Sequence, residues 1–216
     1  MTSIAIIGGH GKVALHVARV LSGEDSGVNV TSFIRKPEQS DDITAVGATP
    51  VVLDVENSTT EQIAEAIKGF DAVVWSAGAG GGAPERTYAV DRDAAIRSMD
   101  AAKAAGVKRY VMVSYLGAGP NHGVPPEDSF FAYAESKAAA DAYLRATDLD
   151  WTVLGPGALT EESATAKITV VDSTPAQRSV SRENVALVVA AVVQRPDTIH
   201  RTIEFVDGAE EIDAAL

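Results

Sequence analysis

The chain has 216 residues, of which 46% are hydrophobic and 22% charged, a composition typical of one globular domain with a sizeable core. Its formal net charge of −12, without a basic stripe, disfavours nucleic acids as partners because their phosphates would be repelled. The lack of cysteine excludes disulfides and thiolate chemistry, and the four histidines show no metal-ligand spacing. We find neither a signal peptide nor an apolar run long enough to cross a membrane, so we expect a cytoplasmic protein with no metal.

Strands and helices alternate along most of the chain. Short β-branched runs and apolar residues at helical spacing predict, in chain order, strand 3–7, helix 12–21, strand 28–34, strand 49–53, helix 58–68, strand 72–76, helix 84–105, strand 107–114, helix 129–147 and strand 151–154. This alternation is typical of parallel βαβ units. It predicts an α/β fold of the Rossmann type, a doubly wound, mostly parallel sheet with helices on both faces.

Local signals mark the ends of the helices. We expect Ser58 to cap the helix over 58–68, with Glu61 completing a capping box and Gly69 just past its end. Asp91 and Asp93 lie near a helix start, where we assign them to a favourable interaction with the helix dipole.

The alternation weakens after Pro156. We expect a short strand over 166–171, a helix over 181–196 and a late strand and turn over 198–208. Ser181 is the expected cap of that helix. These elements are too few for an independent domain, so we predict one domain over residues 1–216, with 155–216 adding substrate-side elements.

A glycine-rich loop separates the first strand from the first helix. The stretch from Gly8 to Ala14 reads G-x-x-G-x-x-A between a strand and a helix, which is the context of a dinucleotide-binding turn. Gly8 permits the turn, and Gly11 lets the backbone approach a diphosphate at the helix N-terminus. The alternative is a purely structural turn. The residues expected to hold the diphosphate are Gly8, Gly9, His10, Gly11, Lys12 and Val13.

The end of the second strand bears on the choice of cofactor. An NAD site usually has a carboxylate there for the ribose 2′-hydroxyl, whereas this strand is followed by Arg35 and Lys36. Two cations suit the extra phosphate of NADP, so we expect NADP(H) rather than NAD(H). The alternative is that both side chains are only solvated.

Two more strand ends point to the same crevice. After the third strand, Asp54 and Val55 can hold an adenine through a carboxylate contact and apolar packing. After the fourth, Ala77, Gly78 and Ala79 let the chain pass close to the ribose and nicotinamide. A solvated aspartate and a flexible glycine loop are the alternatives.

A serine, a tyrosine and a lysine are the candidate catalytic residues. Ser114 ends the fifth strand, and Tyr133 and Lys137 follow on one face of the next predicted helix. Tyr133 can pass a proton to or from a substrate oxygen, and the charge of Lys137 is expected to lower the pKa of Tyr133. Lys137 can also bind the ribose hydroxyls, and Ser114 the same substrate oxygen.

The chain resembles the atypical short-chain dehydrogenases/reductases, a subgroup with NmrA-like proteins, sugar-epimerase-like oxidoreductases and biliverdin reductase B. The resemblance rests on "IAIIGGHGKVALHVARVL", "FIRKPEQ", "VVLDVEN", "AVVWSAGAG", "DAAKAAGVKRYVMVSYLGA", "YAESKAAADAYLRATDLDWTVLGPGALT" and "SRENVALVVAAVV…TIEFVDG". It implies a Rossmann fold binding NAD(P)H, with the nicotinamide near Ser114, Tyr133 and the segment containing Pro156. Relatives commonly have arginine where this chain has Gly155, which removes a charge from that end of the site.

These features predict an NADPH-dependent oxidoreductase that acts on a small carbonyl, quinone or flavin-like substrate. One alternative is an NADP(H)-sensing regulator without turnover, and another is an epimerase or dehydratase. Residues 117–131 and 155–180 are expected to form the substrate pocket, with 117–131 as a lid. Helices 84–105 and 129–147 pair in relatives, and both a monomer and a homodimer remain open.

Overall fold

The computed structural model describes residues 1–23, 26–81, 83–171 and 178–216. Its main sheet has nine strands in the order β11-β8-β10-β6-β5-β4-β1-β2-β3. The sheet is parallel from β10 to β3, and β8 runs antiparallel to both β10 and β11. The strands of this sheet are β1 (Thr2–Ile7), β2 (Val28–Ile34), β3 (Thr49–Val52), β4 (Ala72–Trp75), β5 (Arg109–Val113), β6 (Asp150–Pro156), β8 (Lys167–Val170), β10 (Arg201–Asp207) and β11 (Glu210–Glu211).

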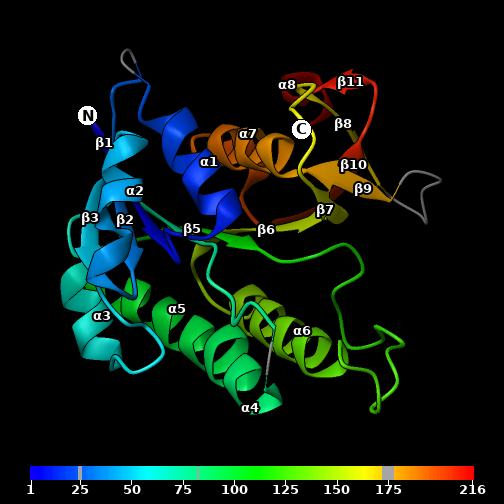
Figure 1. The fold of residues 1–216 in the computed structure, drawn as a ribbon, viewed down its shortest axis with the longest axis horizontal. Coiled ribbons are helices and arrows are strands. Elements are labelled where there is room, and N and C mark those ends of the chain that lie inside the picture. The colour runs from blue at the N-terminus through cyan, green and yellow to red at the C-terminus, as the bar shows by residue number, and fades with distance from the viewer. Residues whose placement is uncertain (24–25, 82, 172–177) are drawn as a thin grey trace.

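Helices cover both faces of the sheet, as Figure 1 shows. One face carries α1 (Lys12–Leu21), α2 (Ser40–Ala45) and α7 (Arg182–Val193). The other carries α3 (Thr60–Ala66), α5 (Ala95–Ala105) and α6 (Phe131–Arg145). The remaining elements are the short helices α4 (Pro84–Thr87) and α8 (Ile212–Ala215), a π-helical segment (Tyr88–Ala94), 3₁₀ turns at Pro37–Gln39 and Pro196–Thr198, and a separate pair of parallel strands, β7 (Ala158–Thr160) and β9 (Ser179–Ser181).

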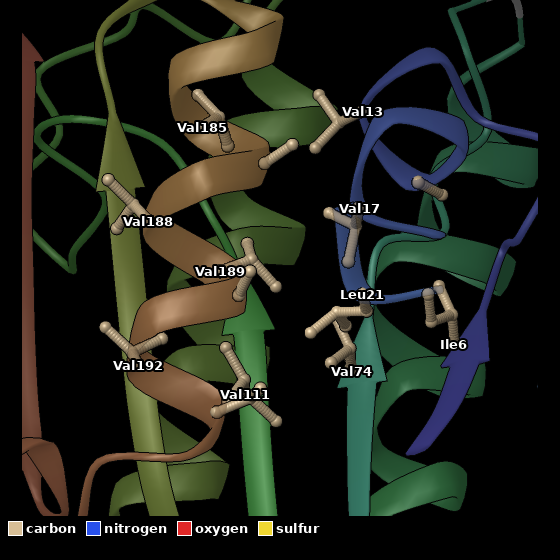
Figure 2. Close-up of a cluster of buried hydrophobic side chains, with 14 of the residues drawn as sticks. Ile6, Val13, Val17, Leu21, Val74, Val111, Val185, Val188, Val189 and Val192 are labelled. Carbon is tan, nitrogen blue, oxygen red and sulfur yellow. The ribbon is translucent and has the colours of Figure 1, made fainter. Parts of the chain in front are cut away.

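The contact between α1 and α7 closes the core on one face. Valines of both helices meet over β1, β4 and β5, and Figure 2 shows Val17 and Val189 directed into the space between them. Fully buried apolar side chains in close-packed contact supply most of the stability of such a layer. This packing holds the first turn of α1, and with it the glycine loop, against the carboxyl end of the sheet.

The predicted fold class is confirmed, and α1 and β2 have the predicted bounds. Ser181 caps α7 by accepting a hydrogen bond from the Asn184 amide at 3.0 Å. Gly106, with φ 76°, ends α5 in the left-handed conformation. The sequence pattern therefore located the strands of the main sheet except β11, and its longer helices, but not α2.

Two details of the prediction are wrong. The cap of α3 is Thr59, and Gln62 rather than Glu61 completes its capping box, because the helix begins later than expected. The predicted helix over 84–105 is divided by the π-helical segment Tyr88–Ala94. A π-helical turn changes which side chains face inward, and such turns are common at functional sites.

Candidate functional site

Two adjoining cavities open at the carboxyl ends of β1, β2, β4 and β5. The first has a volume of about 220 Å³ and the second about 650 Å³. Both are lined by Gly11 and by residues 76–79, which follow β4. This is where dinucleotides bind in open α/β sheets.

The glycines of the first loop allow its backbone to lie close to neighbouring strands and to a ligand. Gly8 has φ +82°, and a Cβ there would lie 2.4 Å from the Cα of Ala77. A Cβ on Gly9 would lie 2.5 Å from that of Ser32. Gly11 is the N-cap of α1 and brings no side chain, so the first-turn amides remain available to an anion. The loop thus fits the diphosphate of a nicotinamide cofactor.

The first cavity contains the residues expected at the adenosine end. Arg35, Asp54 and Val55 line it, as does His10, whose Nε2 lies 2.8 Å from the Asp42 carboxylate. Asp54 also stabilises its own turn, since its Oδ2 accepts a hydrogen bond from Asn57 Nδ2 at 2.7 Å.

The adenosine end of the cavity differs from the prediction at Lys36 and at Glu56. Lys36 is exposed and is not among the described residues that line the cavities. Glu56, which follows β3, lines the first cavity, with Oε2 3.9 Å from Arg35 Nη1 and 3.2 Å from Arg86 Nε. Arg86 also donates to the carbonyl of Ala79, a residue that lines both cavities, at 2.5 Å.

Asp91 is buried beneath the loop that follows β4. It is 1% exposed, and its Oδ2 accepts a hydrogen bond from the Ala79 amide at 2.9 Å. Burial raises the pKa of Asp91, and this effect outweighs the hydrogen bond and the nearby cations that lower it. Asp91 lies in the first turn of the π-helical segment, near a helix start as expected, but its side chain points inward and holds residues 78–79, a role that was not predicted.

Ser114 and Tyr133 lie together in the second cavity, beside Lys12 and Val13 of the glycine loop. The Ser114 hydroxyl is 2.5 Å from the carboxylate of Asp141. Burial raises the pKa of Tyr133, and the negative charges of Asp91 and Asp141 raise it further. The phenol therefore holds its proton.

Lys137 lies in the interior behind Ser114. It is 1% exposed, and its Nζ donates to the Val113 carbonyl at 2.8 Å and to Met112 Sδ at 3.2 Å. The expectation that Lys137 lowers the pKa of Tyr133 is wrong for this structure, because burial and two carboxylates move that pKa upward. Burial lowers the pKa of Lys137 itself, against the opposing effect of Asp141 and Asp91.

A third cavity, of about 530 Å³, adjoins Ser114 and Tyr133. Its wall includes an aromatic group in which the Tyr115 and Tyr133 ring centroids are 5.5 Å apart and those of Phe130 and Tyr133 5.1 Å apart. Pro156 lines this cavity, as does Arg178, so the cavity has a cation in its wall.

The segments predicted to form the substrate pocket contribute unevenly. Of the loop 117–131, Ser129 and Phe130 line the described cavities, and the rest of that loop lies outside their linings. Within 155–180, residues 156–159 and Arg178 line the cavities, and residues 172–177 lie outside the described part of the chain. Arg178 thus lies within the predicted segment, although no motif singled it out.

An ion-pair cluster joins the two sides of the second cavity. Lys12 Nζ lies 2.6 Å from Glu161 Oε1, and Arg182 Nη1 lies 3.1 Å from the same oxygen. Lys12 and Arg182 both line the cavity, so two cations from opposite ends of the sequence face the expected diphosphate position. Arg182 belongs to a stretch that carries the family resemblance, but no cofactor contact was predicted for it.

Comparison with known proteins identifies the family. Residues 8–196 match the model of the NAD(P)H-binding family. The chain is 33% identical to UPF0659 protein YMR090W of Saccharomyces cerevisiae, over 97% of this chain and 95% of that protein. Within the described residues, no helix has the length and apolar character needed to cross a membrane.

Two solved structures are close to this one over nearly their whole length. A putative NAD-dependent epimerase/dehydratase from Bacillus halodurans matches with a TM-score of 0.90 at 30% identity, covering 100% of this chain and 99% of its own. The oxidoreductase ylbE from Lactococcus lactis matches with a TM-score of 0.86 at 30% identity, covering 99% of this chain and 94% of its own. The chain therefore belongs to the NAD(P)H-binding family of Rossmann-fold proteins, among oxidoreductase-like and epimerase-like relatives.

Proposed function

We propose that the protein is an NADPH-dependent oxidoreductase that reduces a small carbonyl, quinone or flavin-like substrate. The observation that carries this proposal is that one cavity is lined both by the glycine loop and by Ser114 and Tyr133. The cofactor, when bound, supplies a hydride from its dihydronicotinamide. The aromatic third cavity opens from the same two residues and would admit the substrate.

The chain supplies the proton and orients the substrate. As the substrate carbonyl carbon accepts the hydride, its π electrons move to oxygen, and that oxygen takes the phenolic proton of Tyr133, which solvent restores. Ser114 donates a hydrogen bond to the same oxygen. The phenol is protonated at neutral pH, as proton donation in reduction requires, and burial raises the pKa of Tyr133 further from neutrality. Lys137 supports the buried carboxylate of Asp91 electrostatically.

The preference for NADPH is part of the proposal. Arg35 is a partly exposed cation at the adenosine end of the first cavity, within reach of a 2′-phosphate. Its guanidinium lies at the outer limit of an ion pair with Glu56, 3.9 Å away, so a phosphate can compete for it. Arg86 lies closer to the same carboxylate and would hold it away from a phosphate bound by Arg35.

The test is the substitution Tyr133→Phe, with Tyr143→Phe as the matched control. Both tyrosines are on α6, but the Tyr143 hydroxyl donates to Asp100 at the surface. NADPH consumption is followed with aldehydes, 9,10-phenanthrenequinone and free flavin, and NADPH binding by fluorescence titration. Tyr133→Phe should abolish turnover and keep NADPH affinity, while Tyr143→Phe keeps both. Full turnover by Tyr133→Phe would overturn the assigned role.

A second candidate is an epimerase or dehydratase, favoured by the name of the Bacillus halodurans relative. That function predicts cofactor that co-purifies with the protein and is not consumed overall. A purified protein that binds NADPH but consumes none with any of these substrates and carries no cofactor would instead support a redox-sensing regulator.

A further inference from the structure

A buried carboxylate lies directly behind the Ser114 hydroxyl. Asp141 is 0% exposed, and its Oδ2 is 2.5 Å from Ser114 Oγ, at the short end of the O–H···O range. Its other oxygen, Oδ1, is buried with no hydrogen-bond partner among the described groups. Tyr133, Lys137 and Asp141 follow at helical spacing on one face of α6, so the site continues one turn beyond the motif.

The single hydrogen of Ser114 can point in only one direction. If Asp141 is ionised, that hydrogen goes to the carboxylate, and Ser114 turns only lone pairs toward the substrate. If Asp141 is protonated, its own hydrogen is donated to Ser114 Oγ, and the serine hydrogen is released toward the cavity. The protonation state of Asp141 therefore decides whether Ser114 is a donor or an acceptor for the substrate.

The surroundings favour the neutral carboxyl group. An ionised carboxylate that is buried with one oxygen unpartnered is costly to keep, whereas a neutral one is much less so. Lys137 does not compensate fully, because its ammonium bonds to the Val113 carbonyl and to Met112 and not to Asp141.

The pKa of Asp141 depends on burial and on the charges that face it. Lys137 and Arg145 on its own helix and the hydrogen bond from Ser114 lower its pKa, but burial outweighs them and raises it. Asp91, from the π-helical segment on the other side of Lys137, competes for the same ammonium. When Asp141 ionises, its charge raises the pKa values of the tyrosines Tyr115 and Tyr133.

We propose that Asp141 is a positioning residue, which remains protonated and donates a hydrogen bond to Ser114 Oγ so that Ser114 donates its own hydrogen to the substrate oxygen. That oxygen then receives two donors, Ser114 and Tyr133, at the moment when it gains negative charge. The inference rests on the proposed function for its role in catalysis. The protonation of Asp141 itself can be measured without any turnover.

The first experiment is ¹³C NMR of the full chain with carboxyl-labelled aspartate, recorded over a pH series with and without NADPH. The Asp141 signal is assigned by its loss in Asp141→Asn. The chemical shift of this signal should be that of a protonated carboxyl group at neutral pH, and it should change to that of a carboxylate only at higher pH. An Asp141 that is ionised at neutral pH would overturn the proposal, whether or not a substrate is found.

The second experiment compares three variants in steady-state quinone reduction. Asp141→Asn keeps a neutral donor to Ser114, so turnover should stay within about threefold and lose the alkaline fall that deprotonation of Asp141 causes. Asp141→Leu removes the donor and should lower kcat about tenfold or more with unchanged NADPH affinity. Ser136→Ala, which removes a buried hydroxyl bonded to the Ala132 carbonyl on the same helix, is the packing control.

Combining the substitutions Ser114→Ala and Asp141→Leu distinguishes a positioning role of Asp141 from a merely structural one. If Asp141 acts through Ser114, adding Asp141→Leu to Ser114→Ala should lower kcat no further. An additional loss in the double variant would contradict the proposal, as would an unchanged pH profile in Asp141→Asn. If Asp141→Leu does not fold, the pH profile of Asp141→Asn and the NMR titration still decide the question.

Discussion

The backbone amide of Ala79 donates a hydrogen bond to the carboxylate of Asp91, at 2.9 Å. Ala79 belongs to the loop shared by the first two cavities, and Asp91 belongs to the π-helical segment beneath it. The Ala79 carbonyl is held in turn by Arg86. Both backbone groups of one loop residue are thus fixed by side chains from the segment that follows it, which orders the loop before a cofactor arrives.

Removal of the Asp91 carboxylate should weaken cofactor binding. Asp91→Ala leaves the Ala79 amide without its acceptor, and a hydrogen bond to a charged group contributes about 1.5–3 kcal/mol. We expect NADPH affinity to fall about tenfold or more in fluorescence titration, and Asp91→Asn, which keeps an acceptor, to lose less. The control is Asp93→Ala in the same segment, where Asp93 pairs with Arg92 at the surface. Equal losses in the Asp91 and Asp93 variants would contradict this role of the loop.

Gly8→Ala should reduce both stability and cofactor binding. The added Cβ meets the Ala77 backbone at 2.4 Å, in addition to the strain of the left-handed conformation at φ +82°. Gly69→Ala is the matched control, because φ is +84° and nothing lies within 4 Å of the added Cβ. The control should lose about 1–2 kcal/mol in denaturant unfolding, and Gly8→Ala distinctly more. Similar losses would show that close approach to Ala77 is unimportant.

Arg35→Ala should separate the two nicotinamide cofactors. If Arg35 binds the 2′-phosphate, the loss of its side chain should lower the affinity for NADPH by about 10-fold to 100-fold and change the affinity for NADH little. Calorimetric titration with both cofactors measures the difference. The control is Arg19→Ala, which removes an exposed cation from the last turn of α1, far along the helix from the glycine loop. Equal weakening of NADPH and NADH by Arg35→Ala would remove the argument for NADP preference.

The fold was predictable because the sequence patterns of strands, helices and turns are local. Part of the candidate site was not, because some of its residues belong to no local motif. The glycine loop, Ser114 and Tyr133 lie in motifs whose spacing depends on one strand–helix unit each. Glu56, Asp91 and Arg178 have no such motif, since they reach the cavities from a turn, from a π-helical segment and from the residue before β9. A π-helical turn rotates side chains out of the 3.6-residue period, so the sequence pattern indicated only a helix-dipole interaction for Asp91.

The role of Lys137 was also beyond sequence reasoning. The spacing of Tyr133 and Lys137 correctly puts them on one face of α6, but the pKa of Tyr133 depends on burial and on carboxylates from two elements. Desolvation is a property of the packed structure and leaves no trace in residue spacing.

The stability of the protein should depend on pH through Asp141. Burial raises the folded-state pKa of Asp141 above its unfolded value, so folding disfavours the ionised form. Relative to Asp141→Asn, the wild type should therefore lose unfolding free energy as pH rises through the folded-state pKa. Denaturant unfolding at several pH values measures the difference, with Asp148→Asn at an exposed position as the control. A difference that does not change with pH would contradict this prediction.

The strand order also determines what the sheet can offer to another chain. β3 is the outermost strand on one side, and since Leu53 donates to Ile34, the alternate amide positions at residues 50 and 52 point outward. Proline at position 50 leaves one of these positions without a hydrogen to donate, although Val52 beside it is 50% exposed. On the opposite side the last strand is only Glu210–Glu211, two like charges. Both borders thus resist edge-to-edge growth into aggregates, which protects a sheet whose interior is strongly apolar.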